Sequence, residues 1–378
     1  MPDRSQSLKI LQIASGTDVN GALVHCHLLC RELVRRGHDV TLVCRRRSWL
    51  WGRLSDVSLR LVDCEMNRWP PGELRPMADW IRRERFDVMH THMSRAHMFG
   101  IVMKHLTGVP VVATAHSRHF QPHWHLNDRV IANSEATRRF HRRVNQLSPR
   151  LMETIHCFID LDRFTTAHPQ IGRALRRQWH FEPDTRVIVV AGDVVPLKGH
   201  RYLFDSLPQL IQRYPDLRLV VVGRFYRPES CTRRLRRFQL EHGLERRVKW
   251  IGRRDNMHEV LAAADLVVIP SIIESLGMVA LESMAAGTPV IASQTGGLTE
   301  LIVDRHNGLL VPPRDSGAIT TAVSELLDDQ ELARNIRDNG MRWVHERFSP
   351  AVLTTQIERV LREVAAGSDD QNQKSPAA

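Results

Sequence analysis

The chain has 378 residues, of which 42% are hydrophobic and 25% are charged, as in a globular protein large enough for two domains. Its 53 lysines and arginines exceed its 42 aspartates and glutamates, so the formal net charge is +11 and the expected partners are anions, namely nucleic acid, anionic lipid or a phosphorylated small molecule. No run of about 18 apolar residues occurs, so no transmembrane helix is expected.

The first apolar segment, residues 8–14, is too short and too interrupted for a secretory signal, and it predicts a buried strand instead. We therefore expect a cytoplasmic protein. None of the cysteines forms a C-x-x-C pair, so reduced and mostly buried thiols are expected. The cysteines are Cys26, Cys30, Cys44, Cys64, Cys157 and Cys231.

Short apolar segments alternate with amphipathic segments in both halves of the chain. The predicted strands are residues 10–14, 40–44, 88–90, 111–114, 130–132, 153–156, 187–191, 219–222, 266–269, 290–292 and 309–311. The predicted helices include residues 22–36, 135–144, 201–213, 259–263 and 278–286. This alternation is typical of parallel sheets covered by helices. The predicted fold class is therefore α/β, with two Rossmann-like parallel-sheet domains facing across a cleft.

The apolar periodicity lapses near residues 164–183, which marks the predicted domain boundary. We place an N-terminal domain at residues 1–165 and a C-terminal domain at residues 184–348. A last amphipathic helix within residues 349–366 can cross back to the N-terminal domain. The polar tail, residues 367–378, is expected to be disordered.

The most informative stretch follows the third predicted strand of the C-terminal half. A short loop carries Glu274, and a helix begins near Met278 and includes Glu282. Ligands bind beyond the carboxyl ends of strands in parallel sheets, and the N–H groups at a helix start attract anions. The amides of Leu276, Gly277 and Met278 are therefore candidate phosphate ligands, and Gly277 allows close approach of the backbone.

Glu274, seven residues and Glu282 resemble the E-x7-E signature of the large family 4 of retaining glycosyltransferases, which have two Rossmann-like domains in the GT-B arrangement. The surrounding residues agree with this family: Ala264-Asp265-Leu266, Ala285-Ala286-Gly287-Thr288-Pro289-Val290-Ile291-Ala292, Gly296-Gly297-Leu298-Thr299-Glu300 and Asn307-Gly308. The resemblance covers nearly the whole chain and is strongest over residues 187–312. It implies that Glu274 faces the hydroxyls of a donor sugar and that Glu282 faces the ribose of its nucleotide. It also implies an acceptor-side N-terminal domain and a nucleotide-sugar-binding C-terminal domain.

Lys198 follows the first predicted strand of the C-terminal half and can stabilise negative charge on a departing diphosphate. A solvated loop lysine is the alternative. The family usually carries an arginine where this chain has Asp193, so either a neighbour such as Arg224 substitutes or phosphate binding is weaker. Asp193 can face the phosphates, point to solvent, or orient Lys198 or Arg224 through a charge-assisted hydrogen bond, and we expect the orienting role.

The N-terminal half offers further candidates. Gly21 stands in the turn where the family carries a glycine pair, and Asn20 before it tolerates a positive φ, so one glycine can suffice. His116 lies where family members present a histidine to the donor sugar, and a histidine packed on the cleft wall is the alternative. His90 and His92 have the spacing of metal ligands, but no third ligand is evident.

The segment Asp160-Leu161-Asp162 fits the D-x-D spacing of metal-dependent glycosyltransferases, but we interpret it as linker structure. The donor diphosphate is instead expected to be neutralised by the helix start and Lys198, without a metal or another cofactor.

A basic and aromatic segment lies in the N-terminal half, and its members are Arg45, Arg46, Arg47, Trp49 and Trp51. This mixture suits an anionic membrane surface or an acceptor. Solvated arginines beside packed tryptophans are the alternative.

These observations predict a metal-independent, retaining glycosyltransferase that moves a hexose-type sugar from a nucleoside diphosphate to a cell-envelope polysaccharide, lipopolysaccharide or lipid-linked acceptor. Peripheral association with the inner face of the cytoplasmic membrane is part of this hypothesis. The alternatives are another nucleotide-sugar enzyme on the same fold, such as an epimerase, and a degenerate protein acting as a partner subunit. A pI near 10.0 raises nucleic-acid binding as well, but no helix-turn-helix, zinc or RNA-binding signature supports it.

Overall fold

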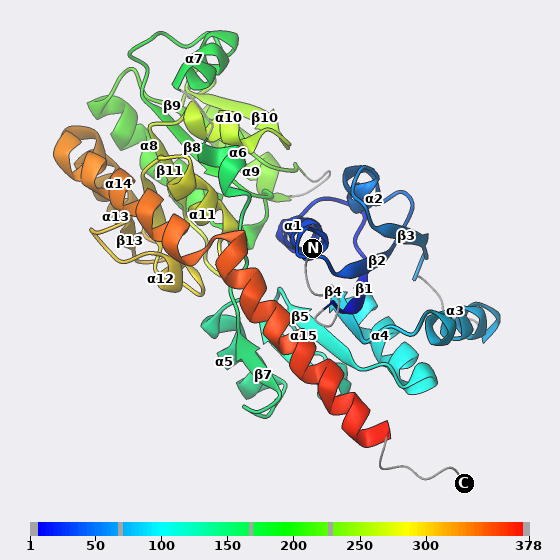
Figure 1. Ribbon diagram of the computed structural model, residues 1–378. Coiled ribbons are helices and arrows are strands. Elements are labelled where there is room, and N and C mark those ends of the chain that lie inside the picture. The colour runs from blue at the N-terminus through cyan, green and yellow to red at the C-terminus, as the bar shows by residue number, and fades with distance from the viewer. Residues whose placement is uncertain (1–6, 67–70, 166–168, 226–229, 373–378) are drawn as a thin grey trace. The chain divides into compact units, whose positions relative to one another are not determined.

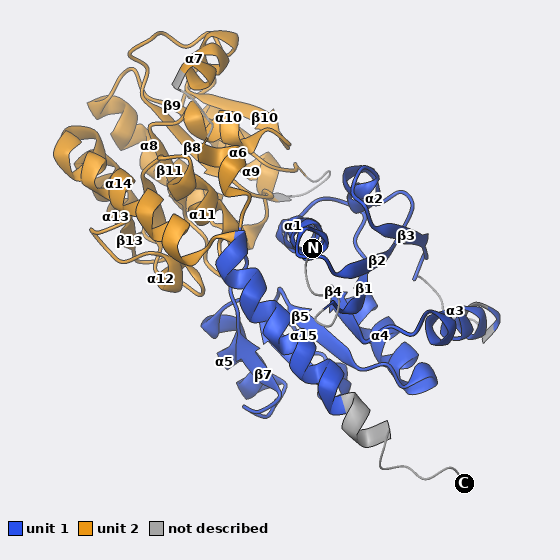
Figure 2. Ribbon diagram, viewed as in Figure 1, with its two compact units in different colours: residues 1–158, 350–378 blue, residues 159–349 orange. Residues whose placement is uncertain are grey.

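The computed structural model describes residues 7–66, 71–165, 169–225 and 230–372 (Figure 1). The chain divides into two compact units, shown in different colours in Figure 2. Unit 1 comprises Met1–Phe158 and Pro350–Ala378, and unit 2 comprises Ile159–Ser349. Each unit is built on its own parallel sheet, which confirms the α/β class with two parallel-sheet domains.

The described part of unit 1 contains a seven-stranded sheet in the order β3-β2-β1-β4-β5-β6-β7. Its strands are β1 (Lys9–Ala14), β2 (Asp39–Cys44), β3 (Arg60–Asp63), β4 (Val88–His92), β5 (Val111–Ala115), β6 (Arg129–Ala132) and β7 (Met152–Thr154). Strands β4 and β5 are buried throughout. Helices on both faces of a parallel sheet exclude water from its central strands, and this is why exposed and buried positions do not alternate along these strands.

The helices of unit 1 are α1 (Gly21–Arg35), α2 (Trp49–Leu54), α3 (Pro71–Glu84), α4 (Ser94–Thr107), η2 (Pro122–Leu126), α5 (Glu135–Val144) and α15 (Pro350–Asn372). Side chains satisfy the first N–H groups of several of them. Asn20 Oδ1 accepts from the N–H groups of Ala22 and Leu23 at the start of α1, and Ser134 Oγ accepts from Thr137 N–H in α5.

Helix α15 follows unit 2 in the sequence but belongs to unit 1, where it packs on α1, β4 and β5. Arg36, next to the end of α1, donates to Thr355 Oγ1 at 2.9 Å and to Glu358 Oε2 at 3.1 Å. The helix continues to Asn372, so the expectation of disorder from residue 367 onward is wrong up to that point. A glycine such as Gly367 costs only about 1 kcal/mol inside a helix. Residues 373–378 lie outside the described residues.

Unit 2 has a six-stranded parallel sheet in the order β10-β9-β8-β11-β12-β13 over its described residues. Its strands are β8 (Val187–Ala191), β9 (Arg218–Val222), β10 (Val248–Gly252), β11 (Leu266–Ile269), β12 (Val290–Ser293) and β13 (Leu309–Val311). The strand order reverses direction between β8 and β11, and such a switch point opens a crevice at the carboxyl ends of the two strands.

The helices of unit 2 are α6 (Leu161–Thr165), α7 (Pro169–Gln178), η3 (Pro196–Lys198), α8 (His200–Arg213), α9 (Ser230–Glu241), α10 (Met257–Ala262), α11 (Met278–Ala285), α12 (Leu298–Leu301), α13 (Ser316–Asp328) and α14 (Gln330–Arg347). Apolar side chains from α8 and α13 pack with those of β8, β9 and β11 in one buried core. Across the part of the chain that is described, no helix is both long and apolar enough to traverse a bilayer.

Strands β3 and β10, which lie at one edge of each sheet, were not predicted from the sequence. Their side chains are mostly exposed or only partly buried, and charged residues such as Arg60, Asp63 and Lys249 interrupt their apolar runs. An edge strand has one neighbouring strand and less cover, so its sequence carries a weaker hydrophobic signal.

Candidate functional site

Two loops of unit 2 bring Lys198 and Glu274 together. Lys198 ends η3, after β8, and Glu274 lies in the loop after β11. Lys198 Nζ donates to Glu274 Oε2 at 2.6 Å, and Ser271 Oγ donates to the same oxygen at 3.1 Å. The side chain of Glu274 is 12% exposed and that of Lys198 is 32% exposed. The residues predicted to face the sugar and the diphosphate therefore meet at the switch point of the sheet.

Backbone contacts hold these two loops against each other. Ile272 N–H donates to Leu197 O at 2.8 Å. Gly199 has a φ of +64°, and a Cβ atom there would lie 1.8 Å from the carbonyl oxygen of Pro270. Only glycine combines this conformation with this close approach. The turn that carries Lys198 is thus fixed relative to the loop that carries Glu274.

Helix α11 begins directly after the Glu274 loop and presents unpaired backbone donors. Gly277 precedes the helix with a φ of +103°. Among the described residues, the N–H groups of Leu276, Gly277 and Met278 have no hydrogen-bond acceptor. Three free amides at the positive end of a helix form a site for an anion such as a phosphate.

Glu282 lies inside α11, and burial raises its pKa to about 7, whereas Arg163 acts in the opposite direction. Arg163 donates through Nε to His258 Nδ1 at 3.3 Å and through Nη2 to the carbonyl oxygen of Asp255. A carboxyl group with this pKa is partly protonated at neutral pH. It can therefore both donate to and accept from the hydroxyls of a ligand.

Asp193 forms a bidentate ion pair with Arg224 at the ends of β8 and β9. Arg224 Nη2 donates to Asp193 Oδ2 at 2.9 Å, and Arg224 Nε and its backbone N–H donate to Oδ1 at 3.2 and 3.3 Å. This is the geometry of a carboxylate that orients an arginine. Lys198 and Arg224 are thus each matched by a carboxylate, and these four side chains together carry no net charge.

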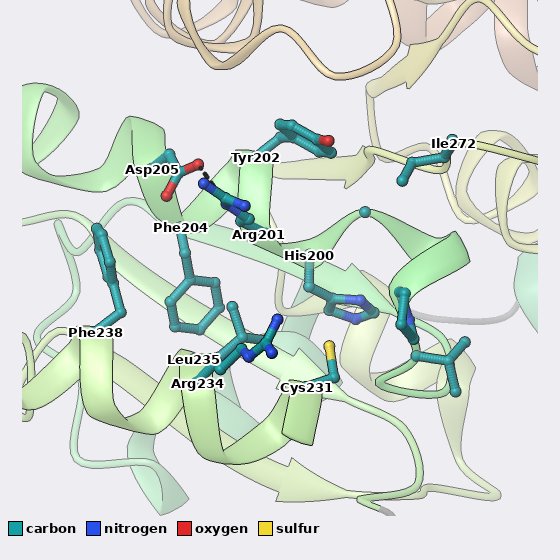
Figure 3. A pocket seen from close by; sticks show the side chains of 13 residues that line it. His200, Arg201, Tyr202, Phe204, Asp205, Cys231, Arg234, Leu235, Phe238 and Ile272 are labelled. Carbon is teal, nitrogen blue, oxygen red and sulfur yellow. Dashed lines mark ion pairs between the residues drawn. The ribbon is translucent and has the colours of Figure 1, made fainter. Parts of the chain in front are cut away.

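A cavity of about 480 Å³ borders the Lys198 turn and lies between α8 and α9 (Figure 3). Phe204, Leu235 and Phe238 give it an apolar wall. His200 also lines it, is buried, and has no hydrogen-bond partner for either ring nitrogen within the described residues. Burial, followed by the charge of Lys198, lowers the pKa of His200 to about 4. The His200 ring is therefore neutral at neutral pH, and the positive charge of this turn is that of Lys198.

Gly21 is the first residue of α1, and Asn20 caps that helix. The φ of Asn20 is −155°, so the turn does not use the positive φ that asparagine tolerates. An extended backbone at this position lets the Asn20 side chain reach two free N–H groups, which a left-handed conformation would not place in reach.

His116 lies just past the end of β5 in unit 1, and both of its ring nitrogens have partners. Nε2 lies 3.2 Å from His92 Nδ1, and Nδ1 lies 3.8 Å from Cys157 Sγ. Burial and the neighbouring histidines lower the pKa of His116 well below its ordinary value, so the ring is neutral. His25 packs edge-on against His116, with ring centroids 5.4 Å apart.

The histidines of β4 also form hydrogen bonds with their neighbours. His90 Nε2 lies 2.7 Å from Thr114 Oγ1. No group of three or more His, Cys, Asp or Glu side chains in the described residues is arranged to hold a metal ion. Asp160 Oδ1 accepts from Arg163 N–H at 3.3 Å at the start of α6, so this aspartate has a structural contact in the crossover between the units.

The basic and aromatic segment is partly folded into unit 1. Arg45 is buried and donates through Nε to the carbonyl oxygen of Glu65 at 2.7 Å, so it does not belong to an exposed patch. Trp49 is partly buried and packs edge-on against His27 at 5.4 Å. Trp51 is also partly buried. Exposed positive charge remains on residues such as Arg46 and Arg47, the latter paired with Glu65 at 3.0 Å.

Two family models match the chain. The model described as "Glycosyltransferase Family 4" matches residues 19–163, and the model described as "Glycosyl transferases group 1" matches residues 173–343. The chain is a family 4-type glycosyltransferase. This confirms the family that the E-x7-E signature indicated, together with the prediction that the protein is an enzyme of the transferase class.

Curated relatives of this glycosyltransferase match along nearly the whole chain. It is 26% identical over 400 residues to the D-inositol 3-phosphate glycosyltransferase of Corynebacterium glutamicum (strain R), covering 95% of each chain. It is also 26% identical over 373 residues to the N-acetyl-alpha-D-glucosaminyl L-malate synthase of Bacillus anthracis, covering 92% of this chain and 94% of the relative.

Solved structures share the fold of this glycosyltransferase. Anabaena Alr3699/HepE in complex with UDP-glucose superposes with a TM-score of 0.85 at 22% identity, covering 94% of this chain and 100% of that chain. WaaG, described as a glycosyltransferase involved in lipopolysaccharide biosynthesis, gives a TM-score of 0.71 at 16% identity, covering 93% of this chain and 99% of that chain. These likenesses confirm the GT-B fold.

Several side chains around the candidate residues were not predicted as site residues from the sequence of this glycosyltransferase: Gln12, Cys157, Arg163, His200 and Ser271. Gln12 did carry a signal, because it is a polar residue within the apolar run of β1 and is fully buried. A buried polar side chain needs a partner, so its presence indicates a network. The other four are ordinary residues in the sequence, and only their contacts in the fold distinguish them.

Proposed function

We propose that the enzyme is a retaining glycosyltransferase that uses a nucleoside diphosphate hexose as donor and needs no metal ion. The observation that carries this proposal is the junction of Lys198, Glu274 and the free amides of Leu276, Gly277 and Met278 at one end of the unit 2 sheet. It combines a cation, a carboxylate and backbone donors, which are the groups needed to bind a sugar hydroxyl next to a diphosphate.

Each group has a separate task in the proposed reaction. The bond between the anomeric carbon and the diphosphate oxygen breaks, and negative charge grows on the departing diphosphate. The N–H groups of the α11 start are already oriented before the reaction, and Lys198 exchanges Glu274 for the diphosphate, so that both stabilise this charge. Glu274 accepts hydrogen bonds from donor hydroxyls, and Glu282 binds the ribose. The acceptor hydroxyl passes its proton to the departing diphosphate, and its oxygen forms the new bond to the anomeric carbon with the same anomeric configuration.

The donor most directly supported is a UDP-sugar, since the structurally similar Alr3699/HepE is described in complex with UDP-glucose. A thermal-shift screen of nucleotide sugars and nucleoside diphosphates tests this choice. UDP-sugars should stabilise the protein more than the GDP and ADP analogues. NMR of the product then tests retention, because the coupling constant of the anomeric proton reports the configuration. An inverted product would contradict the retaining mechanism.

The acceptor is proposed to be anionic, because the chain carries a net charge of +11. A cell-envelope polysaccharide, lipopolysaccharide or lipid-linked acceptor remains the first candidate, with peripheral binding to the inner face of the cytoplasmic membrane. A small anionic polyol or hydroxy acid is the second, and the names of the relatives that use D-inositol 3-phosphate and L-malate favour it. Mass spectrometry of products formed with lipid extracts and with inositol phosphate or malate distinguishes the two.

A further inference from the structure

Four side chains form a continuous hydrogen-bonded chain inside unit 1 that includes His116. Gln12 Oε1 lies 3.0 Å from His92 Nε2, His92 Nδ1 lies 3.2 Å from His116 Nε2, and His116 Nδ1 lies 3.8 Å from Cys157 Sγ. Gln12, His92 and Cys157 are buried, whereas His116 is partly exposed. The chain therefore connects the interior of the sheet to a side chain at its carboxyl edge.

The register of the sheet places these groups on one face. Gln12 is the register partner of His90, and His92 is the register partner of Thr114. Partners in a parallel sheet share a face, and so do residues two apart along a strand. His25 packs against the same group, with its ring centroid 5.9 Å from that of His92. The rings are thus held in place by packing as well as by hydrogen bonds.

The proton positions in this chain depend on one another. Burial and neighbouring histidines lower the pKa values of His92 and His116 well below the ordinary value, so both rings are neutral and each carries one N–H. Gln12 Oε1 can only accept, which places the His92 proton on Nε2 and makes His92 Nδ1 an acceptor. His116 must then donate from Nε2, and its Nδ1 is left as an acceptor for the Cys157 thiol.

We propose that Gln12 and His92 are positioning residues that hold His116 in the Nε2–H tautomer, so that His116 Nδ1 accepts a hydrogen bond from a hydroxyl of the donor sugar. This inference rests on the proposed function and on the family resemblance, which implies that His116 faces the donor sugar. A thiol is a weak donor, and the 3.8 Å contact is long, so Cys157 is the partner that a sugar hydroxyl displaces. The stronger contact with His92 is retained on binding.

The tautomers can be measured directly by NMR on protein labelled with ¹⁵N at histidine, with the His116 signals assigned by their loss in His116→Asn. The wild type should show the Nε2–H tautomer for both His92 and His116. In Gln12→Glu, a carboxylate of the same size stabilises His92 as an imidazolium that donates from both nitrogens. His116 must then accept at Nε2 and carry its proton on Nδ1, so its tautomer reverses. Gln178→Glu, an exposed substitution of the same kind in unit 2, should leave the His116 signals unchanged.

Kinetics test the link to the donor. Reversing the tautomer replaces one acceptor in the site by a donor, so the KM for UDP-glucose in Gln12→Glu should rise about fivefold with little change in kcat, which corresponds to one ordinary hydrogen bond. The affinity for UDP alone should not change, because UDP has no sugar. If Gln12 contributed only to stability, Gln12→Glu would not change the KM for UDP-glucose while leaving the affinity for UDP unchanged.

Three results would overturn the inference: an Nδ1–H tautomer of His116 in the wild type, an unchanged tautomer in Gln12→Glu, or a reversed tautomer with an unchanged KM. The first two concern the positioning chain and need no substrate. If no nucleotide sugar were turned over by the wild type, the proposed function would fail, and the NMR results alone would decide whether Gln12 controls His116.

Discussion

Removing the charge of Glu274 should tighten the binding of a nucleoside diphosphate while it slows the reaction. Lys198 Nζ lies 2.6 Å from Glu274 Oε2. Lys198 must leave this carboxylate, at least in part, to bind a diphosphate. Glu274→Gln weakens the competing interaction and makes Lys198 more available, so the affinity for UDP should increase.

The size of the effect follows from the geometry of this pair. A hydrogen bond between charged groups contributes about 1.5–3 kcal/mol when it is well shielded from water. The Lys198 side chain is 32% exposed, so solvent screening reduces the contribution to about 1 kcal/mol, or about fivefold in the dissociation constant for UDP. Turnover should fall by about 2–4 kcal/mol of barrier, because the carboxylate no longer stabilises the positive charge that develops on the sugar.

Isothermal titration of UDP at constant ionic strength measures the first effect. Glu325→Gln is the matched control, since it removes one carboxylate from unit 2 but breaks a pair with Arg305 instead. A second comparison introduces Glu274→Gln into the Lys198→Met variant. Glu274→Gln should then leave UDP affinity unchanged, because the cation for which Glu274 and UDP compete is absent. Unchanged or weaker UDP binding in Glu274→Gln, relative to the control, would refute the exchange of partners by Lys198.

Four other outcomes are expected. Burial raises the pKa of Glu282 in the folded protein from 4.5 to about 7. Ionisation of Glu282 therefore lowers the free energy of unfolding progressively as the pH rises between these two values. Glu282→Gln should raise the Tm at pH 8 and change it little at pH 4.5, as measured by differential scanning fluorimetry. Asp193→Ala should lower turnover by releasing Arg224, whereas tighter UDP binding in both Asp193→Ala and Asp193→Arg would reject the orienting role. Turnover should be unchanged in excess chelator. If the chelator abolished turnover and manganese or magnesium restored it, the enzyme would not be metal-independent. Trp51→Ser should reduce binding to anionic vesicles without changing UDP affinity, in contrast to Trp343→Ser in unit 2, and a wild type that ignores such vesicles would exclude the membrane role.

Local sequence patterns were sufficient for the family, the fold class and the central strands. Residues 266–269 and 290–292 form uninterrupted apolar runs, because coverage on both faces favours apolar side chains at every position of a strand. The Glu274 loop also carries its own signal, since a glycine before a helix and two glutamates at fixed spacing are local features. Strands β3 and β10 gave no such signal, because charged residues interrupt their short apolar runs.

The tertiary structure decided which of these groups act on one another. Lys198 and Glu274 are 76 residues apart, and Gln12 and His92 are 80 apart, so their contacts depend on how the strands are ordered in each sheet. The same is true of Asp193, for which the sequence left Lys198 and Arg224 open as partners, and the structure pairs it with Arg224 at the end of the neighbouring strand. The sequence by itself determined which chemical groups the enzyme has and which strands carry them. Only the folded sheets determined their partners, because a hydrogen bond requires donor and acceptor within about 3 Å, a distance that residue spacing does not specify for segments so far apart.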